Sequence, residues 1–295
     1  MWLLAVSAAI ALPPDLPHAS AEADVCIGGS CGGLTGDGAK ALSRSQTIAA
    51  LRDEHSKIQE DRTISLRYTS IVHCPGNSPS AGQDAYCRGA VEYCELYWPG
   101  SVGPLVEIWQ RQEYSDGRPP SGWSTIGLTC YTDLVPSKPV LSLAQIKDAF
   151  HHTDFSRPRL SLQPRGNLTL VTLPAYYEVR WPVTGFEPGE IDTIDRARML
   201  GNAVRIRPTL VSYRYDFGDG TGRGPTTSPG GVYPTGDVTH AYDNAGIYRT
   251  RVDIVYSADF SINGSGWIPI RDTVTIAGAP QNLTVTTAVN RLYNN

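Results

Sequence analysis

Six cysteines are the residues of this 295-residue sequence whose spacing points most clearly to a chemistry. They are even in number and lie in the first half of the chain: Cys26, Cys31, Cys74, Cys87, Cys94 and Cys130. No two of them form a C-x-x-C pair, so the spacing does not favour zinc. We expect disulfides, which form in an oxidising compartment. One bridge would join Cys26 to Cys31, and two more would join the other four cysteines in a connectivity that the sequence leaves open.

Carboxylates gather in one short run from Glu187 to Asp195, which contains four of them. Ca²⁺ takes several oxygen ligands from flexible loops, so this run is the best candidate for calcium or for carboxylate chemistry. A solvated loop explains the same composition more often, and we favour it. His151 and His152 lack the i,i+4 spacing of a helical metal pair and a third ligand nearby, which favours a surface loop. No metal or other cofactor is predicted.

A catalytic centre is not apparent from the remaining motifs. Asp216-Phe217-Gly218 spells the magnesium-binding tripeptide of protein kinases, but neither a Gly-rich loop nor H-R-D precedes it. No Ser or Cys has a marked base partner. We predict a protein that is not an enzyme. The alternative is an exported hydrolase, or a hydrolase accessory, with its activity in the N-terminal half, because a sequence does not show whether two carboxylates face each other across a cleft.

Four tryptophans offer a different chemistry, since flat aromatic rings stack on sugar rings: Trp98, Trp109, Trp123 and Trp181. Disulfide-framed cores also use tryptophan, and we favour a core position for most of them.

Composition favours many short strands and turns over long helices. The chain is 41% apolar and 18% charged, and it contains 29 Gly and 22 Pro. Its formal net charge of −4 provides no general attraction to nucleic acid or to anionic lipid. Nucleic acid is therefore not an expected partner.

The first residues are typical of an export signal. Trp2 to Leu12 is an apolar run too short to span a bilayer, and small residues follow it, with cleavage expected after Ala21 or Ala23. No Lys or Arg precedes the apolar run, so either Met1 is not the true start or the signal is atypical. Export agrees with the cysteine content, and no membrane span is expected once residues 1–23 are removed.

Two helices are predicted. Apolar residues recur at three- and four-residue intervals between Ala39 and Asp61, with Asp37 as the expected cap. We expect this helix to pack on its own domain rather than to pair with a partner helix. The second helix runs from Leu141 to Phe150, where Ser142 and Gln145 have the spacing of a capping box.

Strands are predicted where apolar and polar residues alternate. In the first half these are Thr63–Val72 and Leu105–Gln110, and the rest of the segment between Cys74 and Cys130 is expected to form loops tied by disulfides. Seven strands are expected in the second half: Leu168–Leu173, Tyr177–Trp181, Ala203–Ile206, Leu210–Phe217, Ile247–Tyr256, Thr273–Ile276 and Leu283–Thr287.

Two stretches of the second half resemble the PKD domain. The family pattern is an aromatic-x-FGDG turn followed by H-x-Y-x-x-x-G-x-Y. The matching positions are Tyr215, Asp216, Phe217, Gly218, Asp219, Gly220, His240, Tyr242, Gly246 and Tyr248. The resemblance implies an immunoglobulin-like β-sandwich in which these residues are structural. The one departure is Tyr215, at a position where the family often has Trp.

The wider sequence is similar to a group of secreted actinobacterial proteins that contain a PKD domain. The similarity rests on Gln163 to Pro174 (QPRGNLTLVTLP) and on Gly266-Trp267, and it covers roughly residues 141–290. It implies a location and an architecture but no activity.

Together these features predict a mainly β protein of five parts. They are a signal peptide (1–23), a Gly-rich segment with a helix (24–62), a disulfide-tied β and loop region (63–140), a short helix and linker (141–165), and a PKD-like sandwich (166–290). The expected function is that of a secreted or cell-surface protein that binds protein or envelope polysaccharide, or acts as a spacer.

Overall fold

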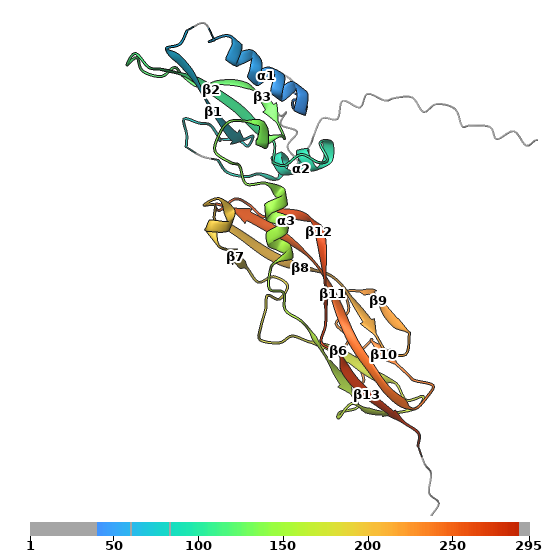
Figure 1. The fold of residues 1–295 in the computed structure, drawn as a ribbon. Coiled ribbons are helices and arrows are strands. Elements are labelled where there is room, and N and C mark those ends of the chain that lie inside the picture. The colour runs from blue at the N-terminus through green and yellow to red at the C-terminus, as the bar shows by residue number, and fades with distance from the viewer. Residues whose placement is uncertain (1–39, 60, 83, 289–295) are drawn as a thin grey trace, which may run out of the picture. The chain divides into compact units, whose positions relative to one another are not determined.

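The computed structural model describes residues 40–59, 61–82 and 84–288, and in this part the chain is mainly β (Figure 1). The predicted signal peptide, the Gly-rich segment, Cys26, Cys31 and the expected cap Asp37 lie outside the described residues. No helix among those described is long and apolar enough to cross a membrane.

A three-stranded antiparallel sheet organises the first part of the described chain. Its strands are β1 (Ile64–Val72), β2 (Val106–Tyr114) and β3 (Ser124–Thr129), in the order β1-β2-β3. Thr69 lies opposite Trp109, and Trp109 lies opposite Thr125. Successive side chains of a strand point to opposite faces. Ile108 and Gln110 therefore face one side of the sheet, while Trp109 and Arg111 face the other.

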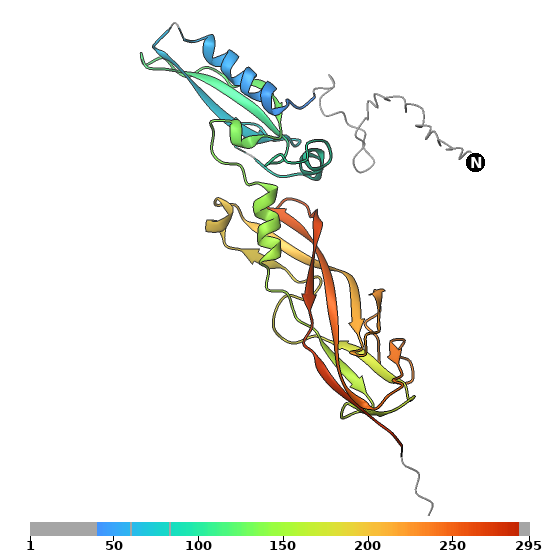
Figure 2. The same cartoon turned by 45° about the vertical axis from the view of Figure 1, so that its right-hand side comes forward.

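Helix α1 (Arg44–Ser56) lies along one face of this sheet (Figures 1 and 2). It begins later than the sequence predicts, because Ser43 and Gln46 form a capping box that fixes its first turn. A hydrogen bond between the hydroxyls of Thr47 and Thr129 (2.9 Å) joins the helix to β3. Thr47 is the buried residue of the helix, whereas Ile48 is 41% exposed, so the expected apolar stripe is weak.

Two disulfides close the segment between β1 and the end of β3. They join Cys74 to Cys87 and Cys94 to Cys130, which confirms the prediction that these four cysteines form two bridges. The expectation of loops alone is wrong here. Helix α2 (Arg88–Tyr97) begins directly after Cys87, and it buries Ala90, Val91 and Cys94. Its Ala90 carbonyl accepts a hydrogen bond from the Leu105 amide, so α2 is held by the strand that follows it.

Helix α3 (Leu143–His151) follows the short 3₁₀ helix η1 (Thr132–Leu134). Ser142 and Gln145 form the predicted capping box, so the second predicted helix is confirmed. The helix buries Ile146, Ala149 and Phe150 and packs on β12 (Ile268–Ala277).

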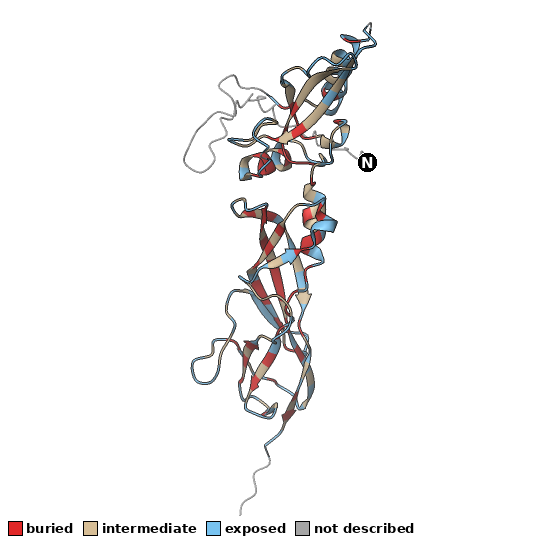
Figure 3. Ribbon diagram, turned by 90° about the vertical axis from the view of Figure 1, so that its left-hand side faces the viewer, coloured by how far each residue is buried: buried red, intermediate tan, exposed pale blue. Residues whose placement is uncertain are grey.

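The second half is built around two long antiparallel strands, β8 (Val204–Asp216) and β11 (Gly246–Ile262). They belong to a seven-stranded sheet that also contains β5 (Leu168–Leu170), β7 (Asp192–Ile194), β9 (Gly222–Thr226), β12 and β13 (Gln281–Thr286). A separate three-stranded sheet has the order β10-β6-β4, from Thr239–His240, Ala175–Arg180 and Arg159–Gln163. Buried and exposed residues alternate along these strands (Figure 3).

Most strand boundaries differ from the sequence prediction, and β3, β7, β9 and β10 were not expected. The expected strands Ala203–Ile206 and Leu210–Phe217 are one continuous strand, in which Pro208 lies opposite Ala258 and the register shifts by one residue beyond it. A β-bulge at Val211, between the paired residues Leu210 and Ser212, takes up this shift in register without ending the strand. The segment expected to be a linker contains β4, which pairs with β6.

Candidate binding surfaces

Residues of the stretches 215–220 and 240–248 meet around the turn that follows β8. The amide and the hydroxyl of Thr221 both donate to Asp219 Oδ1, at 2.9 and 2.6 Å, and His240 Nε2 lies 2.6 Å from Asp219 Oδ2. Asp216 Oδ1 accepts a hydrogen bond from the amide of Gly218. The carboxylates therefore fix the turn, as expected from Asx-type turns.

Aromatic rings continue this cluster into the core. The His240 ring stacks on Phe217, with ring centroids 4.3 Å apart, and the Tyr242 hydroxyl donates to the Phe217 carbonyl at 2.7 Å. The hydroxyls of Tyr177, in β6, and Tyr242, between β10 and β11, lie 2.6 Å apart. Tyr248 stacks on Tyr242, and its hydroxyl donates to the Asn244 carbonyl four residues upstream. These contacts give the motif residues structural partners.

Asp219 is ionised in this cluster over most of the pH range. Burial acts to raise its pKa, but hydrogen bonds from Thr221 and His240 outweigh burial and lower the pKa to about 2. The Thr221 hydroxyl donates to the carboxylate, while its distance to His240 Nε2 is 3.5 Å. The arrangement lacks the hydrogen bond from hydroxyl to imidazole that activates a nucleophile.

We expect the domain to lose stability in acid through Asp219. Because folding lowers the pKa of this group from 3.8 to about 2, its stabilisation is complete above pH 3.8 and disappears as the pH falls toward 2. Asp219→Asn should cost about 1–2 kcal/mol at neutral pH, where the carboxylate hydrogen bonds are lost. Urea unfolding between pH 6 and 2 measures both effects. The exposed Asp243→Asn is the matched control, and equal acid sensitivity of the two variants would contradict the assignment.

The acidic run from Glu187 to Asp195 does not bring its carboxylates together. Glu190 accepts a hydrogen bond from the Glu187 amide, Asp192 lies in β7, and Asp195 caps the next 3₁₀ helix through the Ala197 amide. Within the described ranges no three His, Cys, Asp or Glu side chains are grouped as metal ligands. The calcium alternative therefore has no grouped ligand set in this part of the chain.

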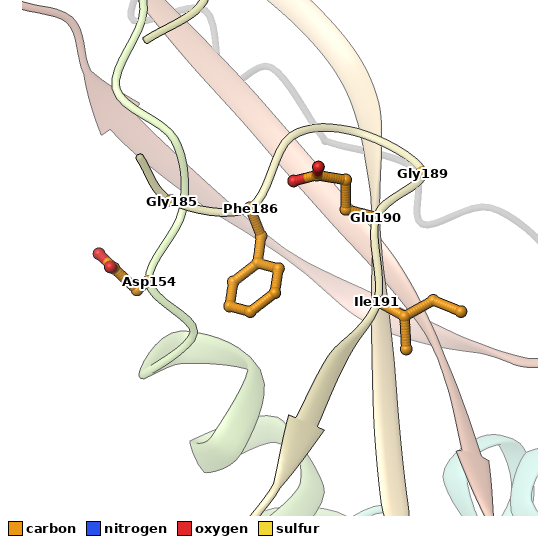
Figure 4. A pocket seen from close by; sticks show the side chains of 6 residues that line it. All are labelled: Asp154, Gly185, Phe186, Gly189, Glu190 and Ile191. Atoms are coloured by element: carbon orange, nitrogen blue, oxygen red, sulfur yellow. The ribbon is translucent and has the colours of Figure 1, made fainter. Parts of the chain in front are cut away.

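An open cavity of about 690 Å³ borders this run (Figure 4). It is lined by Asp154, Gly185, Phe186, Gly189, Glu190 and Ile191. Burial raises the pKa of the neighbouring Asp192, and the charge of Asp154 adds to the rise. Phe186 also serves the fold, because its backbone pairs with Asp154 and Ser156.

His151 and His152 lie at the end of α3, and each has its own carboxylate. His151 Nε2 is 2.9 Å from Asp272, and His152 Nδ1 is 3.3 Å from Asp148. The two imidazoles therefore do not share a ligand site.

The four tryptophans separate into different environments. Trp98 packs edge-on against Tyr131, and Trp181 directly follows β6. Trp109 and Trp123 instead accompany Arg111 on the sheet face that points away from α1. The Arg111 guanidinium lies 4.8 Å from the centre of the Trp123 ring, and both tryptophans are partly exposed. We call Arg67, Trp109, Arg111, Glu113 and Trp123 the aromatic face.

The two arginines of the aromatic face share one carboxylate. Glu113 Oε1 accepts from Arg111 at 2.8 Å and from Arg67 at 3.2 Å. These hydrogen bonds hold the pKa of Glu113 below its usual range. One positive charge is left on the face, which gives only a weak attraction to an anionic polymer.

Unsatisfied hydrogen-bonding groups are concentrated at the centre of β2. Four buried side-chain polar atoms have no partner in the described part of the chain, and three of them are on consecutive residues: Trp109 Nε1, Gln110 Oε1 and Arg111 Nε. Folded proteins rarely leave such groups unpaired, because each costs about 1–3 kcal/mol. Trp109 Nε1 and Arg111 Nε belong to the aromatic face, whereas Gln110 Oε1 belongs to the face of the sheet toward α1.

A second, smaller cavity of about 250 Å³ lies between α1 and the sheet. Its lining residues are Glu54, Lys57, Ile58, Leu66, Gln110, Arg111, Gln112, Ser121 and Ser124. Hydrogen bonds from Lys57 and Gln110 lower the pKa of Glu54, so the carboxylate is ionised and paired. The centre of β2 thus lies between this cavity and the aromatic face.

A further tryptophan site was not predicted. Trp267 lies beneath the guanidinium groups of Arg205 and Arg207, at 5.3 and 4.4 Å from the ring centre. Arg207 is paired with Asp259 at 2.8 Å, and Arg205 donates to Ser261. The Gly266-Trp267 match was the available signal, but the partner arginines are more than fifty residues away in sequence. Because the described side chains here are paired, this stack is better suited to holding β8 and β11 together than to binding.

Comparison with known proteins gives no indication of what these surfaces bind. No protein-family model matches the chain, and no curated protein sequence matches it.

Proposed function

We propose that this chain is an exported, non-catalytic binding protein that recognises an envelope polysaccharide through the aromatic face. In this proposal the second half is a PKD-like β-sandwich that serves as a scaffold. The contacts among Phe217, His240 and Tyr242 support that part of the proposal, because they give the motif residues a structural use.

Export is supported by the two disulfides, since structural disulfides are typical of oxidising compartments outside the cytosol. The apolar run at the start of the sequence supports the same location. The mature protein would then act outside the cell or at its surface.

A non-catalytic role is supported by the state of the polar groups near the two surfaces. The one carboxylate of the smaller cavity, Glu54, is bonded to Lys57 and Gln110. General acid–base catalysis needs a group that is poised to exchange a proton, and a carboxylate held by two donors is poorly suited to it. We therefore favour binding over hydrolysis.

The observation that carries the proposal is the grouping of two partly exposed tryptophans, Trp109 and Trp123, with Arg111 on one face of the sheet. Sugar rings present apolar faces that stack on indole and hydroxyls that pair with amide, indole and guanidinium groups. A polysaccharide can use both properties at once.

We expect the mature chain to be retained on isolated cell envelopes. The double variant Trp109→Ala/Trp123→Ala should lose at least about 10-fold in affinity, since two aromatic contacts that become buried on binding are together worth more than about 1.4 kcal/mol. Sedimentation with envelope fragments measures this. Tyr97→Ala, which removes a ring that is 48% exposed elsewhere in the same half, is the control and should bind as the wild type does. Equal retention of both variants would rule out the aromatic face, and retention abolished by protease treatment of the envelope would identify a protein ligand instead.

A further inference from the structure

Strand β12 pairs with β11 along one edge and leaves its other edge open. Within the described ranges β11 is its only strand partner (Figure 1). The backbone groups of Val274–Ala277 make no hydrogen bond outside this pairing in the described part of the chain. A row of unpaired N–H and C=O groups is a template for another strand.

The open stretch of this edge runs from Thr273 to Ala277. At one end it is bounded by Asp272, whose carboxylate lies 2.9 Å from His151 of α3. At the other end Ala279 forms a bridge with Arg159, so that position already has a partner. Exposed and half-buried side chains alternate between these limits. The exposed residues indicate that no described segment covers the stretch.

Edge strands of folded proteins are normally protected against pairing by charges, prolines, bulges or short length. The stretch Thr273–Ala277 (TVTIA) has no charge and no proline, and it is rich in residues that favour strands. Strands β5, β7 and β10 are only two or three residues long. The longer edge strands have protective features, which are Arg67 in β1, Arg159 in β4, Arg223 and Pro225 in β9, and a bulge in β3.

The open stretch is complementary to a second copy of itself. In an antiparallel pair centred on Thr275, Val274 of one copy lies opposite Ile276 of the other, and Thr275 lies opposite its counterpart. Residues directly opposite each other point to the same face, so apolar side chains meet apolar ones and hydroxyls meet hydroxyls. Centring the pair on Val274 would place Asp272 opposite Ile276. Centring it on Ile276 would place Gly278 opposite Val274.

We infer that the chain forms a two-fold dimer in which the β12 strands of two copies pair antiparallel about Thr275. Val274 and Ile276 lie opposite Tyr256 and Ile254 of β11, which are fully buried, yet they are themselves only half-buried at the edge. Pairing would remove their apolar surface from water. Because each copy uses the same edge, the assembly closes at two chains.

The expected dimer is a weak one. A short strand edge buries less than the area of about 1,200–2,000 Å² that is typical of stable complexes, so we expect dissociation in the micromolar range. Sedimentation velocity of the full mature chain with its disulfides intact, from about 5 to 500 µM, covers that range. The expected result is a shift from monomer to dimer with rising concentration and no larger species.

Charges at Thr275 test the register. This residue is exposed, so Thr275→Lys and Thr275→Glu should leave the monomer folded. Each variant places two like charges opposite each other at the axis, and each should weaken the dimer at least about 10-fold. An equimolar mixture of the two should recover association, because Lys then lies opposite Glu. Thr193→Lys, at an exposed Thr of β7 in the same sheet, is the control and should dimerise as the wild type does.

Three results would overturn the inference. They are a wild-type chain that stays monomeric at the highest concentration, a wild-type species larger than a dimer, and Thr275 variants that dimerise as the wild type does or do not recover association when mixed. A monomeric wild type would leave the edge to an extended segment of another protein.

The result is independent of the proposed function, because sedimentation is measured without any polysaccharide. A dimer would carry two aromatic faces, and two linked sites bind a polymer more tightly than one. Dimerisation of a chain that is not retained on envelopes would remove the proposed function and leave the dimer. Retention of a monomeric chain would do the reverse.

Discussion

Gly218→Ala should destabilise the second half by about 3 kcal/mol or more, whereas Gly220→Ala should cost only about 1 kcal/mol. Both glycines lie in the turn after β8 and have positive φ, +82° and +88°. They differ in what a Cβ would meet. At Gly218 it would lie 2.8 Å from the backbone nitrogen and oxygen of Arg249, while at Gly220 nothing lies within 4 Å.

The physical difference is between strain in one residue and displacement of a strand. A left-handed φ costs an ordinary residue about 1–2 kcal/mol, and alanine at Gly220 would have only this cost. At Gly218 the clash is with the backbone of β11, which moves only if its pairing with β8 and β13 is disturbed. Urea unfolding of the two variants at pH 7 measures the contrast. Equal losses of stability would show that the turn is not packed against β11.

The double variant Cys94→Ala/Cys130→Ala should lose about 4 kcal/mol of stability, and Cys74→Ala/Cys87→Ala about 3 kcal/mol, from the loss of chain entropy in the unfolded state alone. The difference follows from sequence separations of 36 and 13 residues, because a longer closed loop restricts the unfolded chain more. The first bridge also ties α2 to the end of β3, and both of its cysteines are buried. Its loss should therefore be the more damaging of the two.

Alanine is preferred to serine in these variants, since a hydroxyl at a buried cysteine position would be left without a partner. Urea unfolding followed by tryptophan fluorescence reports on Trp98, Trp109 and Trp123. Peptide mapping without reduction should yield the two linked pairs in the wild type. Cross-linked peptides in another combination, or a loss below about 1 kcal/mol for the Cys94 and Cys130 variant, would contradict the assignment.

Local signals in the sequence were sufficient where the determining contacts are themselves local. The capping box of Ser142 and Gln145 needs only a spacing of three residues, and α3 begins where it predicts. The alternation from Ile64 to Val72 likewise predicts β1. Helix α1 is shorter than the pattern from Ala39 to Asp61 predicts, because the capping box of Ser43 and Gln46 fixes its first turn.

Elements without a regular local pattern were missed. Helix α2 begins after Cys87, contains Cys94 and shows no extended apolar period. Its position depends on the disulfide from Cys94 and on a hydrogen bond with Leu105. Strands β4, β7, β9 and β10 have two to five residues each and are defined by their neighbours. Pairing with a strand distant in sequence is what makes such short segments extended.

The cysteines show which features the sequence determines and which depend on the tertiary structure. By itself the sequence determined that Cys74, Cys87, Cys94 and Cys130 would be oxidised and that Asp219 and Gly220 would turn the chain, because cysteine number and turn chemistry are properties of residue type and spacing. Only the tertiary structure decided which cysteines are joined and that Trp109, Gln110 and Arg111 meet α1 on one side and Trp123 on the other. The physical reason is that a binding surface is made of side chains brought together by strand register and helix packing, and neither is fixed until the whole sheet forms.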